Sequence, residues 1–362
     1  MVYHTNMSSI CLSMIVKNEA HCIIKCLESI KQFINYWIIC DTGSTDGTQN
    51  IIREYLKDIP GELYEHVWES FEANRNLALN LSYNKSDYIL WIDADDILNI
   101  NNPSNISKLI DPIYNIEIYH GDIIYKRPHL IRNDIKCKWV GVLHEYLEMP
   151  PGIAINTLKD SNIIFGGIGN RSKDPNKYVN DALVFEKALL TDPANSRYTF
   201  YCAQSYRDAK NFKKAIEFYE KRISMGDWIE EQFTSAFEIA KIFEILQQDN
   251  VSLIESAYLR AHNLCPTRAE ALCYLSAYCR RNKLYDKAYF YSKTASVIAV
   301  PLNGLFVELN CYKWKIIDEL AISAFYIGKK EEAKYLNLAL ISSGSLPKSE
   351  IDRIKTNLNY CL

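Results

Sequence analysis

The strongest constraint on the fold of this chain is a change in its hydrophobic pattern near residue 165. Before this point, short runs rich in β-branched and aromatic residues alternate with segments whose apolar residues recur at helical spacing. The strand-like runs are residues 10–16, 36–41, 62–67 and 88–93, and the helix-like segments are 20–33 and 48–57. Such alternation is typical of βαβ units, so we expect a mostly parallel sheet whose two faces are covered by helices.

The pattern changes in two steps after residue 100. Residues 100–168 are less regular and are expected to add strands of mixed orientation beside the main sheet. The stretch "GGIGNRSKDPNK" at 166–177 then combines glycines, a proline and charges, as a linker or an active-site loop does. We therefore divide the chain into an α/β domain at residues 1–170 and a helical domain at residues 171–362.

The helical part is expected to be of the tetratricopeptide type. Such a repeat needs small or aromatic residues at fixed positions of a unit of about 34 residues, because two antiparallel helices pack closely and stack on the next pair. Two successive units of this sequence fit the repeat when they are aligned in a single register. The residues at the expected positions are Phe185, Ala188, Pro193, Ala203, Tyr206, Ala215 and Tyr219. An unrelated helical bundle is the alternative.

Composition argues against several functions. The 41 Lys and Arg nearly balance the 44 Asp and Glu, so nothing indicates nucleic-acid binding or a basic membrane patch. The longest early apolar run, residues 10–16, is too short for a signal sequence or a membrane span. Eleven cysteines are spread through apolar segments without a CxxC pair, as expected for buried thiols in a reducing compartment. We therefore expect a soluble, cytoplasmic protein with no integral membrane segment.

A cluster of three acids follows the most buried-looking strand. Asp93, Asp95 and Asp96 come directly after "YILWI". Crowded carboxylates repel one another unless a cation or hydrogen-bond donors compensate, and Asp-x-Asp places two of them on one side of an extended segment. Mg²⁺ or Mn²⁺, which prefer oxygen ligands, would compensate this charge. Capping of a following helix is the alternative.

A second polar cluster follows the strand at 36–41. In "DTGSTDGT", Gly43 and Gly47 allow tight turns and the hydroxyl groups can cap a helix, so most of this stretch is expected to be structural. Asp41 differs, because it closes a buried strand at the edge where a base or a ribose could contact it.

The motifs "LSMIVKNEA", "CLESI", "DTGSTDGT", "FEANRNLAL" and "YILWIDADD" occur in this order along the chain. Together they closely resemble the nucleotide-sugar-dependent glycosyltransferases of family two, which have the GT-A fold. The resemblance covers roughly residues 10–165, and the helical part looks like the tetratricopeptide half of a subgroup in which such repeats follow the transferase. It implies a donor with a nucleoside diphosphate, most commonly UDP, and Mn²⁺ or Mg²⁺ as cofactor.

The resemblance also implies roles for individual residues. Arg75 would contact the pyrophosphate or steady the acidic cluster, Asp95 would be the direct metal ligand, and Asp93 would lie nearer the ribose or a metal-bound water. Asp96 could act in either position. The residues implied in nucleotide-sugar binding are Val16, Lys17, Asn18, Glu19, Asp41, Arg75, Asp93, Ala94 and Asp95.

The stretch "WVGVLHEY" supplies the remaining candidates for chemistry. An inverting transfer needs a base to take the proton of the acceptor hydroxyl, and Glu145 is the first candidate, ahead of Asp122 and Asp134. His144 is a candidate metal ligand, with a role as base or as a structural residue as alternatives.

These features predict a metal-dependent glycosyltransferase that moves a hexosyl or N-acetylhexosaminyl group from a UDP-sugar to a glycan or protein acceptor, with inversion. The helical repeats would bind a protein partner or a second copy of the chain. An inactive transferase-like scaffold is the main alternative. A metal-dependent hydrolase is disfavoured, because its required order of motifs is absent. The Gln-x-x-Arg-Trp signature of processive polymerases is also absent from the sequence, which argues against synthesis of a long polysaccharide.

Overall fold

The computed structural model describes residues 8–121, 123–247 and 250–362. The chain divides into two compact units, Met1–Gly121 with Tyr125–Pro193 and Asp122–Ile124 with Ala194–Leu362. The predicted division after residue 170 stays a prediction, because a compact unit need not end where a sequence family ends. Within the described residues, no helix is both long and apolar enough to span a membrane.

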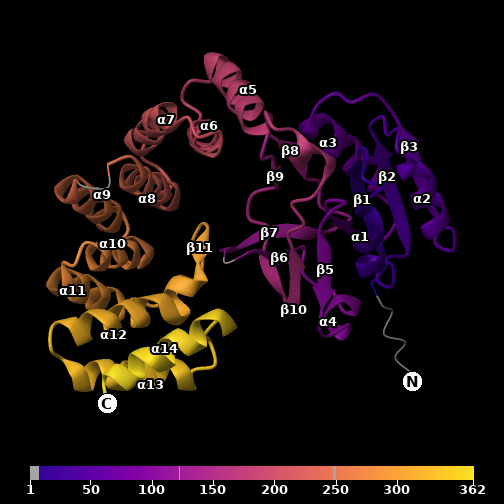
Figure 1. The fold of residues 1–362 in the computed structure, drawn as a ribbon. Helices are drawn as coiled ribbons and strands as arrows, with labels where there is room; N and C mark the ends of the chain where they lie inside the picture. Colours follow the sequence, from indigo (N-terminus) through magenta and orange to yellow (C-terminus); the bar gives the residue numbers. More distant parts are fainter. Residues whose placement is uncertain (1–7, 122, 248–249) are drawn as a thin grey trace. The chain divides into compact units, whose positions relative to one another are not determined.

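The first unit is built on a sheet with the strand order β3-β2-β1-β4-β7-β6-β10-β5 (Figure 1). Strands β3, β2, β1 and β4 are parallel, whereas β7 runs antiparallel to β4 and β5 runs antiparallel to β10. The strands are β1 (Ile10–Val16), β2 (Tyr36–Asp41), β3 (Gly61–Glu65), β4 (Tyr88–Trp91), β5 (Ile97–Ile100), β6 (Ile113–His120), β7 (Ile123–Arg132) and β10 (Ile155–Ile164). Strands β8 (Lys138–Val140) and β9 (Tyr146–Glu148) form a separate antiparallel pair.

Helices cover both faces of the parallel strands, because successive side chains of a strand point to opposite faces. Along β1, Leu12 and Met14 join the core cluster that contains the buried face of α1 (Ile23–Ile30), whereas Cys11 packs in a cluster with Ala78 of α3 (Phe71–Ser82). The other helices of this unit are α2 (Thr48–Tyr55), α4 (Ser104–Ser107), the 3₁₀ turn η1 (Asn170–Lys173) and α5 (Lys177–Thr191). The expected mostly parallel α/β sheet is confirmed.

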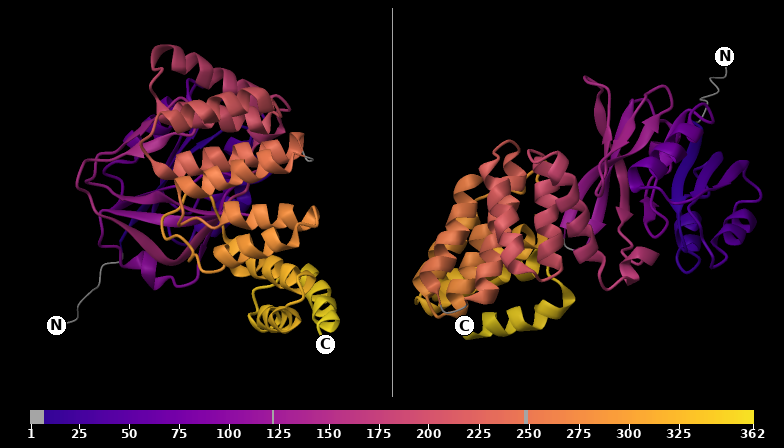
Figure 2. Two further views of the ribbon diagram at one scale, coloured as in Figure 1. Left: turned by 90° about the vertical axis from the view of Figure 1, so that its left-hand side faces the viewer. Right: turned by 90° about the horizontal axis from the view of Figure 1, so that it is seen from above.

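The second unit consists almost entirely of helices, which follow one another as a stacked array (Figure 2). They are α6 (Ser196–Asp208), α7 (Phe212–Ser224), α8 (Ile229–Leu246), α9 (Val251–Leu264), α10 (Glu270–Arg281), α11 (Tyr285–Ala295), the π-helix η2 (Cys311–Lys315), α12 (Ile316–Tyr326), α13 (Lys330–Ser342) and α14 (Lys348–Tyr360). The short strand β11 (Val307–Glu308) pairs with residues 123–124, which belong to the same unit.

The small and aromatic positions expected from the repeat lie inside these helix pairs. Ala203 and Tyr206 on α6, and Ala215 and Tyr219 on α7, are all buried. Small residues let the two helices approach, and the tyrosine rings fill the space beside them. The fold class expected from the sequence, a GT-A-like α/β region followed by tetratricopeptide-like helices, is confirmed.

Candidate functional site

The carboxyl ends of β1 and β2 lie side by side, with Val16 opposite Asp41 in the parallel register. Asp41 is 1% exposed, and its Oδ1 accepts hydrogen bonds from the backbone N–H groups of Gly43 (2.9 Å) and Ser44 (2.8 Å). Its Oδ2 is buried and has no hydrogen-bond partner among the described residues. One oxygen of Asp41 therefore stabilises the turn, and the other remains as an acceptor at the edge where ligands gather in open α/β sheets.

The loop after β1 is tied to the loop after β2. Asn18 has the left-handed φ of +58°, which asparagine tolerates, and its backbone N–H donates to Ser44 Oγ over 2.8 Å. The N–H of Glu19 donates to Thr48 Oγ1 over 2.9 Å. Lys17 is exposed, whereas Val16 is buried. The predicted nucleotide-binding stretch is thus held in one conformation by hydroxyl groups of "DTGSTDGT".

Arg75, on α3, connects two of the predicted acids. Its Nη2 lies 2.7 Å from Asp93 Oδ1, and its Nε lies 3.6 Å from Glu145 Oε2. The guanidinium carbon is 5.2 Å from the ring centre of Trp91 and 5.1 Å from that of Trp139. Indole faces attract a cation and exclude water, so the two ion pairs lie in a medium of low polarity. The structure therefore brings together three predicted site residues that are up to 70 positions apart in sequence.

The same helix holds the segment that carries Glu145. The side chain of Asn76 makes two hydrogen bonds with the backbone of Trp139, of 2.8 and 2.9 Å. Glu72 Oε2 accepts from the N–H of Gly141 over 3.0 Å, and Gly141 has a φ of +128°, which favours glycine. The motif "FEANRNLAL" thus provides Arg75 and also two residues, Glu72 and Asn76, that position its neighbours.

Three acids of the site, Asp93, Asp96 and Glu145, have displaced pKa values. Burial would raise the pKa of Asp93, but the positive charges of Arg75 and Arg127 outweigh it and lower that pKa. Burial raises the pKa of Glu145, and Arg75 offsets only part of this effect. Burial, with the negative charge of Asp93, raises the pKa of Asp96 to about 7. At neutral pH, Asp93 is therefore ionised and Asp96 is close to half-protonated.

Residues 166–170, which we call the glycine strap, lie against the acidic cluster. Asp95 Oδ2 accepts from the N–H groups of Ile168 (3.0 Å) and Gly169 (2.8 Å), and Asp96 Oδ1 accepts from that of Gly166 (3.0 Å). A Cβ atom on Gly166 would lie 1.9 Å from the carbonyl oxygen of Asp95, so a larger residue does not fit there. Backbone donors therefore compensate part of the charge that the sequence had led us to assign to a metal.

The structure describes two of the three remaining candidates, His144 and Asp134. His144 is exposed, with a φ of +51°, and its ring lies parallel to Phe185 at 6.1 Å. Its role as a metal ligand with Asp95 stays a prediction. Asp134 is exposed and forms an ion pair with Arg132 over 2.7 Å. Asp122 lies outside the described residues.

Two residues of β7 were missed by sequence reasoning. The ring of His129 stacks on Trp91 at 4.2 Å, and its Nδ1 lies 2.8 Å from the carbonyl oxygen of Trp91. The guanidinium of Arg127 lies 5.1 Å from the ring centre of Trp91. Burial lowers the pKa of His129 to about 3, so this imidazole is neutral. Arg127 and His129 are two residues apart, which places both side chains on one face of a strand. This spacing is the sequence signal that could have identified them together.

Known proteins resemble both parts of this chain in sequence. Residues 11–165 match the family model described as "Glycosyl transferase family 2", which confirms the family expected for this region. The chain is 26% identical over 229 residues to the SPbeta prophage-derived glycosyltransferase SunS of Bacillus subtilis (strain 168), covering 60% of this chain and 53% of that protein. A TPR repeat-containing protein of Synechococcus elongatus is 29% identical over 151 residues, covering 39% of this chain and 36% of that protein.

Solved structures with a similar helical part include that of YrrB, "a TPR protein with an unusual peptide-binding site". It has a TM-score of 0.37 and 15% identity, and the match covers 50% of this chain and 84% of that one. The chain spans about half the length of the SunS proteins that it matches.

Proposed function

We propose that this chain is a metal-dependent glycosyltransferase that moves a hexosyl or N-acetylhexosaminyl group from a UDP-sugar to a hydroxyl group of a glycan or protein, with inversion. The observation that carries the proposal is the mostly buried Arg75 between Asp93 and Glu145. Both Arg75 Nε and Glu145 Oε1 are buried without a hydrogen-bond partner among the described residues. Such atoms are rare in folded proteins and point to a ligand-binding role.

The donor would bind along the carboxyl ends of β1, β2 and β4. Asp41 Oδ2 is an acceptor suited to an N–H of a base or a hydroxyl of a ribose. The backbone of Val16 to Glu19 would flank the nucleotide, with Lys17 at the exposed side. Arg75 would stabilise the diphosphate as it leaves with additional negative charge.

Mn²⁺ or Mg²⁺ fits the chemistry of the acidic turn, because hard cations take carboxylate oxygens. Asp95 and His144 would hold the ion, with Asp93 and Ala94 facing the nucleotide. When bound, the metal supplies positive charge that neutralises the leaving diphosphate. Since Asp95 Oδ2 already accepts two N–H groups of the glycine strap, Asp95 would use its other oxygen or release the strap.

Glu145 would act as the base. Its pKa is raised by burial and it is 5% exposed, so it holds a proton more readily than a surface glutamate. A base acts only when deprotonated, and the rate of transfer should therefore rise with pH through the pKa of Glu145.

The helical unit would bind the acceptor, a protein partner or a second copy of the chain, as stacked helical repeats do. The alternative function is an inactive transferase-like scaffold. It is less favoured, because a scaffold has no need of a mostly buried arginine between two acids.

Thermal melting with UDP, with and without Mn²⁺, tests the proposal. A ligand that binds only the folded protein at about 100 times its Kd adds roughly 2.7 kcal/mol to stability. We expect UDP to raise Tm more with Mn²⁺ than without it, and Asp95→Asn to remove the difference. If neither UDP nor another nucleoside diphosphate raised Tm, the scaffold would replace the transferase. Release of UDP from a panel of UDP-sugars would then identify the sugar.

A further inference from the structure

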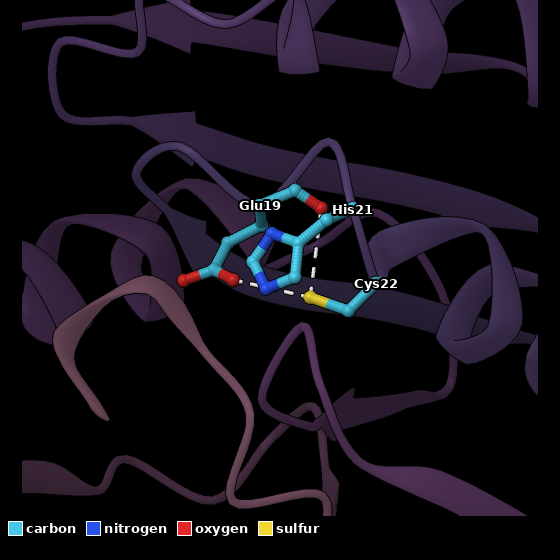
Figure 3. A group of neighbouring side chains, drawn as sticks. All are labelled: Glu19, His21 and Cys22. Carbon is cyan, nitrogen blue, oxygen red and sulfur yellow. Dashed lines mark hydrogen bonds between the residues drawn. The ribbon is translucent and has the colours of Figure 1, made fainter. Parts of the chain in front are cut away.

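Three potential metal ligands lie together in the turn that precedes α1. One ligand atom from each of Glu19, His21 and Cys22 lies within 4.8 Å of the others (Figure 3). Cys22 Sγ is 3.1 Å from Glu19 Oε2, and the thiol is buried, whereas His21 is exposed. Of these residues, the proposed transfer reaction uses only Glu19.

The glycine strap supplies contacts that orient two of the three side chains. Nε2 of His21 lies 2.8 Å from the carbonyl oxygen of Ile168, and the N–H of Asn170 lies 3.2 and 3.3 Å from the two carboxylate oxygens of Glu19. Metal-binding histidines and carboxylates typically have such backbone partners, which hold them in place and reduce the entropy lost on binding. The cluster therefore has both potential ligands and the supporting contacts of a metal site.

We propose that Glu19, His21 and Cys22 form a binding site for Zn²⁺, separate from the hard-cation site predicted at Asp95. Their oxygen, nitrogen and sulfur atoms are the ligand types that Zn²⁺ takes, at about 2.0 to 2.3 Å, whereas Mg²⁺ does not take sulfur. Three protein ligands leave the fourth tetrahedral position to water. The ligand atoms around a tetrahedral zinc lie roughly 3 to 4 Å apart. The three side chains, whose ligand atoms lie within 4.8 Å of one another, therefore need to move only slightly to bind the ion.

Binding exchanges a proton for the metal. The S–H bond of Cys22 breaks, its proton passes to the buffer, and the thiolate sulfur bonds to Zn²⁺ without any change of oxidation state. Burial raises the pKa of Cys22 to about 12, the negative charges of Glu19 and Asp95 add to this effect, and Lys173 opposes it. Because binding releases this proton, the apparent affinity for Zn²⁺ should rise with pH.

Metal titration of the full chain tests the site. The chelator-treated protein would be titrated with Zn²⁺ against a colorimetric zinc indicator, and with Co²⁺ by absorption spectroscopy. We expect one equivalent of zinc, and a thiolate-to-cobalt charge-transfer band in the near ultraviolet. His21→Gln and Cys22→Ser should each weaken binding by at least about 10- to 100-fold, the loss seen for outer-sphere partners alone.

Three variants serve as controls. His120→Gln removes an exposed imidazole and Cys361→Ser a buried thiol outside the cluster, and both should bind zinc as the unchanged protein does. Asp95→Asn should also retain zinc, because Asp95 is not one of the three ligands and the amide oxygen of asparagine can still accept from the N–H groups of the glycine strap. His21→Gln changes an exposed residue and should remain folded by circular dichroism, so the test does not depend on Cys22→Ser alone.

Several results would overturn the proposal: no zinc bound, zinc retained by His21→Gln and Cys22→Ser, a cobalt spectrum without the thiolate band, or loss of zinc in Asp95→Asn alone. The last result would assign the ion to the acidic turn instead. None of these measurements requires a sugar donor, so they are independent of the transfer reaction.

Discussion

Replacing Arg75 by methionine should destabilise the first unit, and the loss should depend on pH. Methionine keeps most of the volume between Trp91 and Trp139 but removes the charge. Asp93 would lose its 2.7 Å ion pair and Glu145 its positive neighbour. Both acids would then be left with only the more distant charge of Arg127 as compensation, in a site of low polarity.

The size of the effect follows from burial. Breaking a fully buried ion pair costs about 3–5 kcal/mol. The side chain of Arg75 is 12% exposed and that of Glu145 6%, but the side chain of Asp93 is 33% exposed and retains part of its hydration. We therefore expect a loss of about 2–4 kcal/mol in the free energy of unfolding at pH 7.5.

The sign of the pH dependence is set by Asp93. Its pKa is lowered in the folded protein, so its pairing with Arg75 adds stability above the unfolded-state pKa, and this stability is lost as pH falls through the folded pKa. In Arg75→Met the pKa of Asp93 should instead be raised by burial. Protonation then relieves the cost, so the difference between variant and wild type should shrink toward pH 4.

Urea unfolding at pH 7.5 and pH 4.5, followed by tryptophan fluorescence, measures this difference. Trp91 and Trp139 flank Arg75, and the unfolding of the helical unit should be fitted as a separate transition. Arg53→Met is the matched control, because Arg53 forms an exposed ion pair with Glu65 and should change stability by no more than about 0.5 kcal/mol. Equal losses in the two variants at pH 7.5, or a loss from Arg75→Met that does not vary with pH, would refute the argument.

Three further predictions concern single residues of the site. Glu145→Gln should lower kcat by about 10²- to 10⁴-fold while leaving the Kd for UDP within twofold, measured by UDP release and by melting, and an unchanged kcat would exclude Glu145 as the base. Gly166→Ala should lower the stability of the first unit by about 1–3 kcal/mol in urea, because its Cβ atom would overlap the carbonyl oxygen of Asp95. His129→Phe should reduce the amount by which the free energy of unfolding falls when the pH is lowered. The pKa of His129 is lowered to about 3, so the unfolded chain takes up the proton first, below about pH 6.5, and the wild type should lose about 2 kcal/mol from this residue by pH 5. Urea midpoints at pH 7.5 and 5.0 that fell equally in both proteins would contradict this assignment.

The local hydrophobic pattern of the sequence was sufficient to predict strands in the parallel half of the sheet. Continuous apolar runs predicted β1 and β2 at the residues where the structure has them, because strands buried on both faces carry little polar character. The strand expected at 88–93 ends at Trp91 instead, because the chain turns and the N–H of Asp96 bonds to the carbonyl oxygen of Asp93 over 3.1 Å. Strand ends depend on such turns, which alternation of apolar residues does not encode.

The local hydrophobic pattern could not predict contacts between segments that are far apart in the sequence. His129 stacks on Trp91 only because β7 returns antiparallel to β4, and this pairing depends on the order of strands in the whole sheet. In the same way, the stretch at 166–177 was identified as a linker or active-site loop, but the bonds from Ile168 and Gly169 to Asp95 span more than 70 residues. The charge of the acidic cluster was correctly expected to need compensation, and the backbone proved to supply part of it.

The bonds between the glycine strap and the acids have a consequence for how sequences with this fold could diversify. The donors are main-chain amides, so replacing Ile168 or Asn170 by any residue except proline leaves them in place. Ile168 is half exposed, and its side chain takes no part in holding Asp95. Mutation could therefore change the surface of this segment while the acidic turn beneath it keeps the same hydrogen bonds.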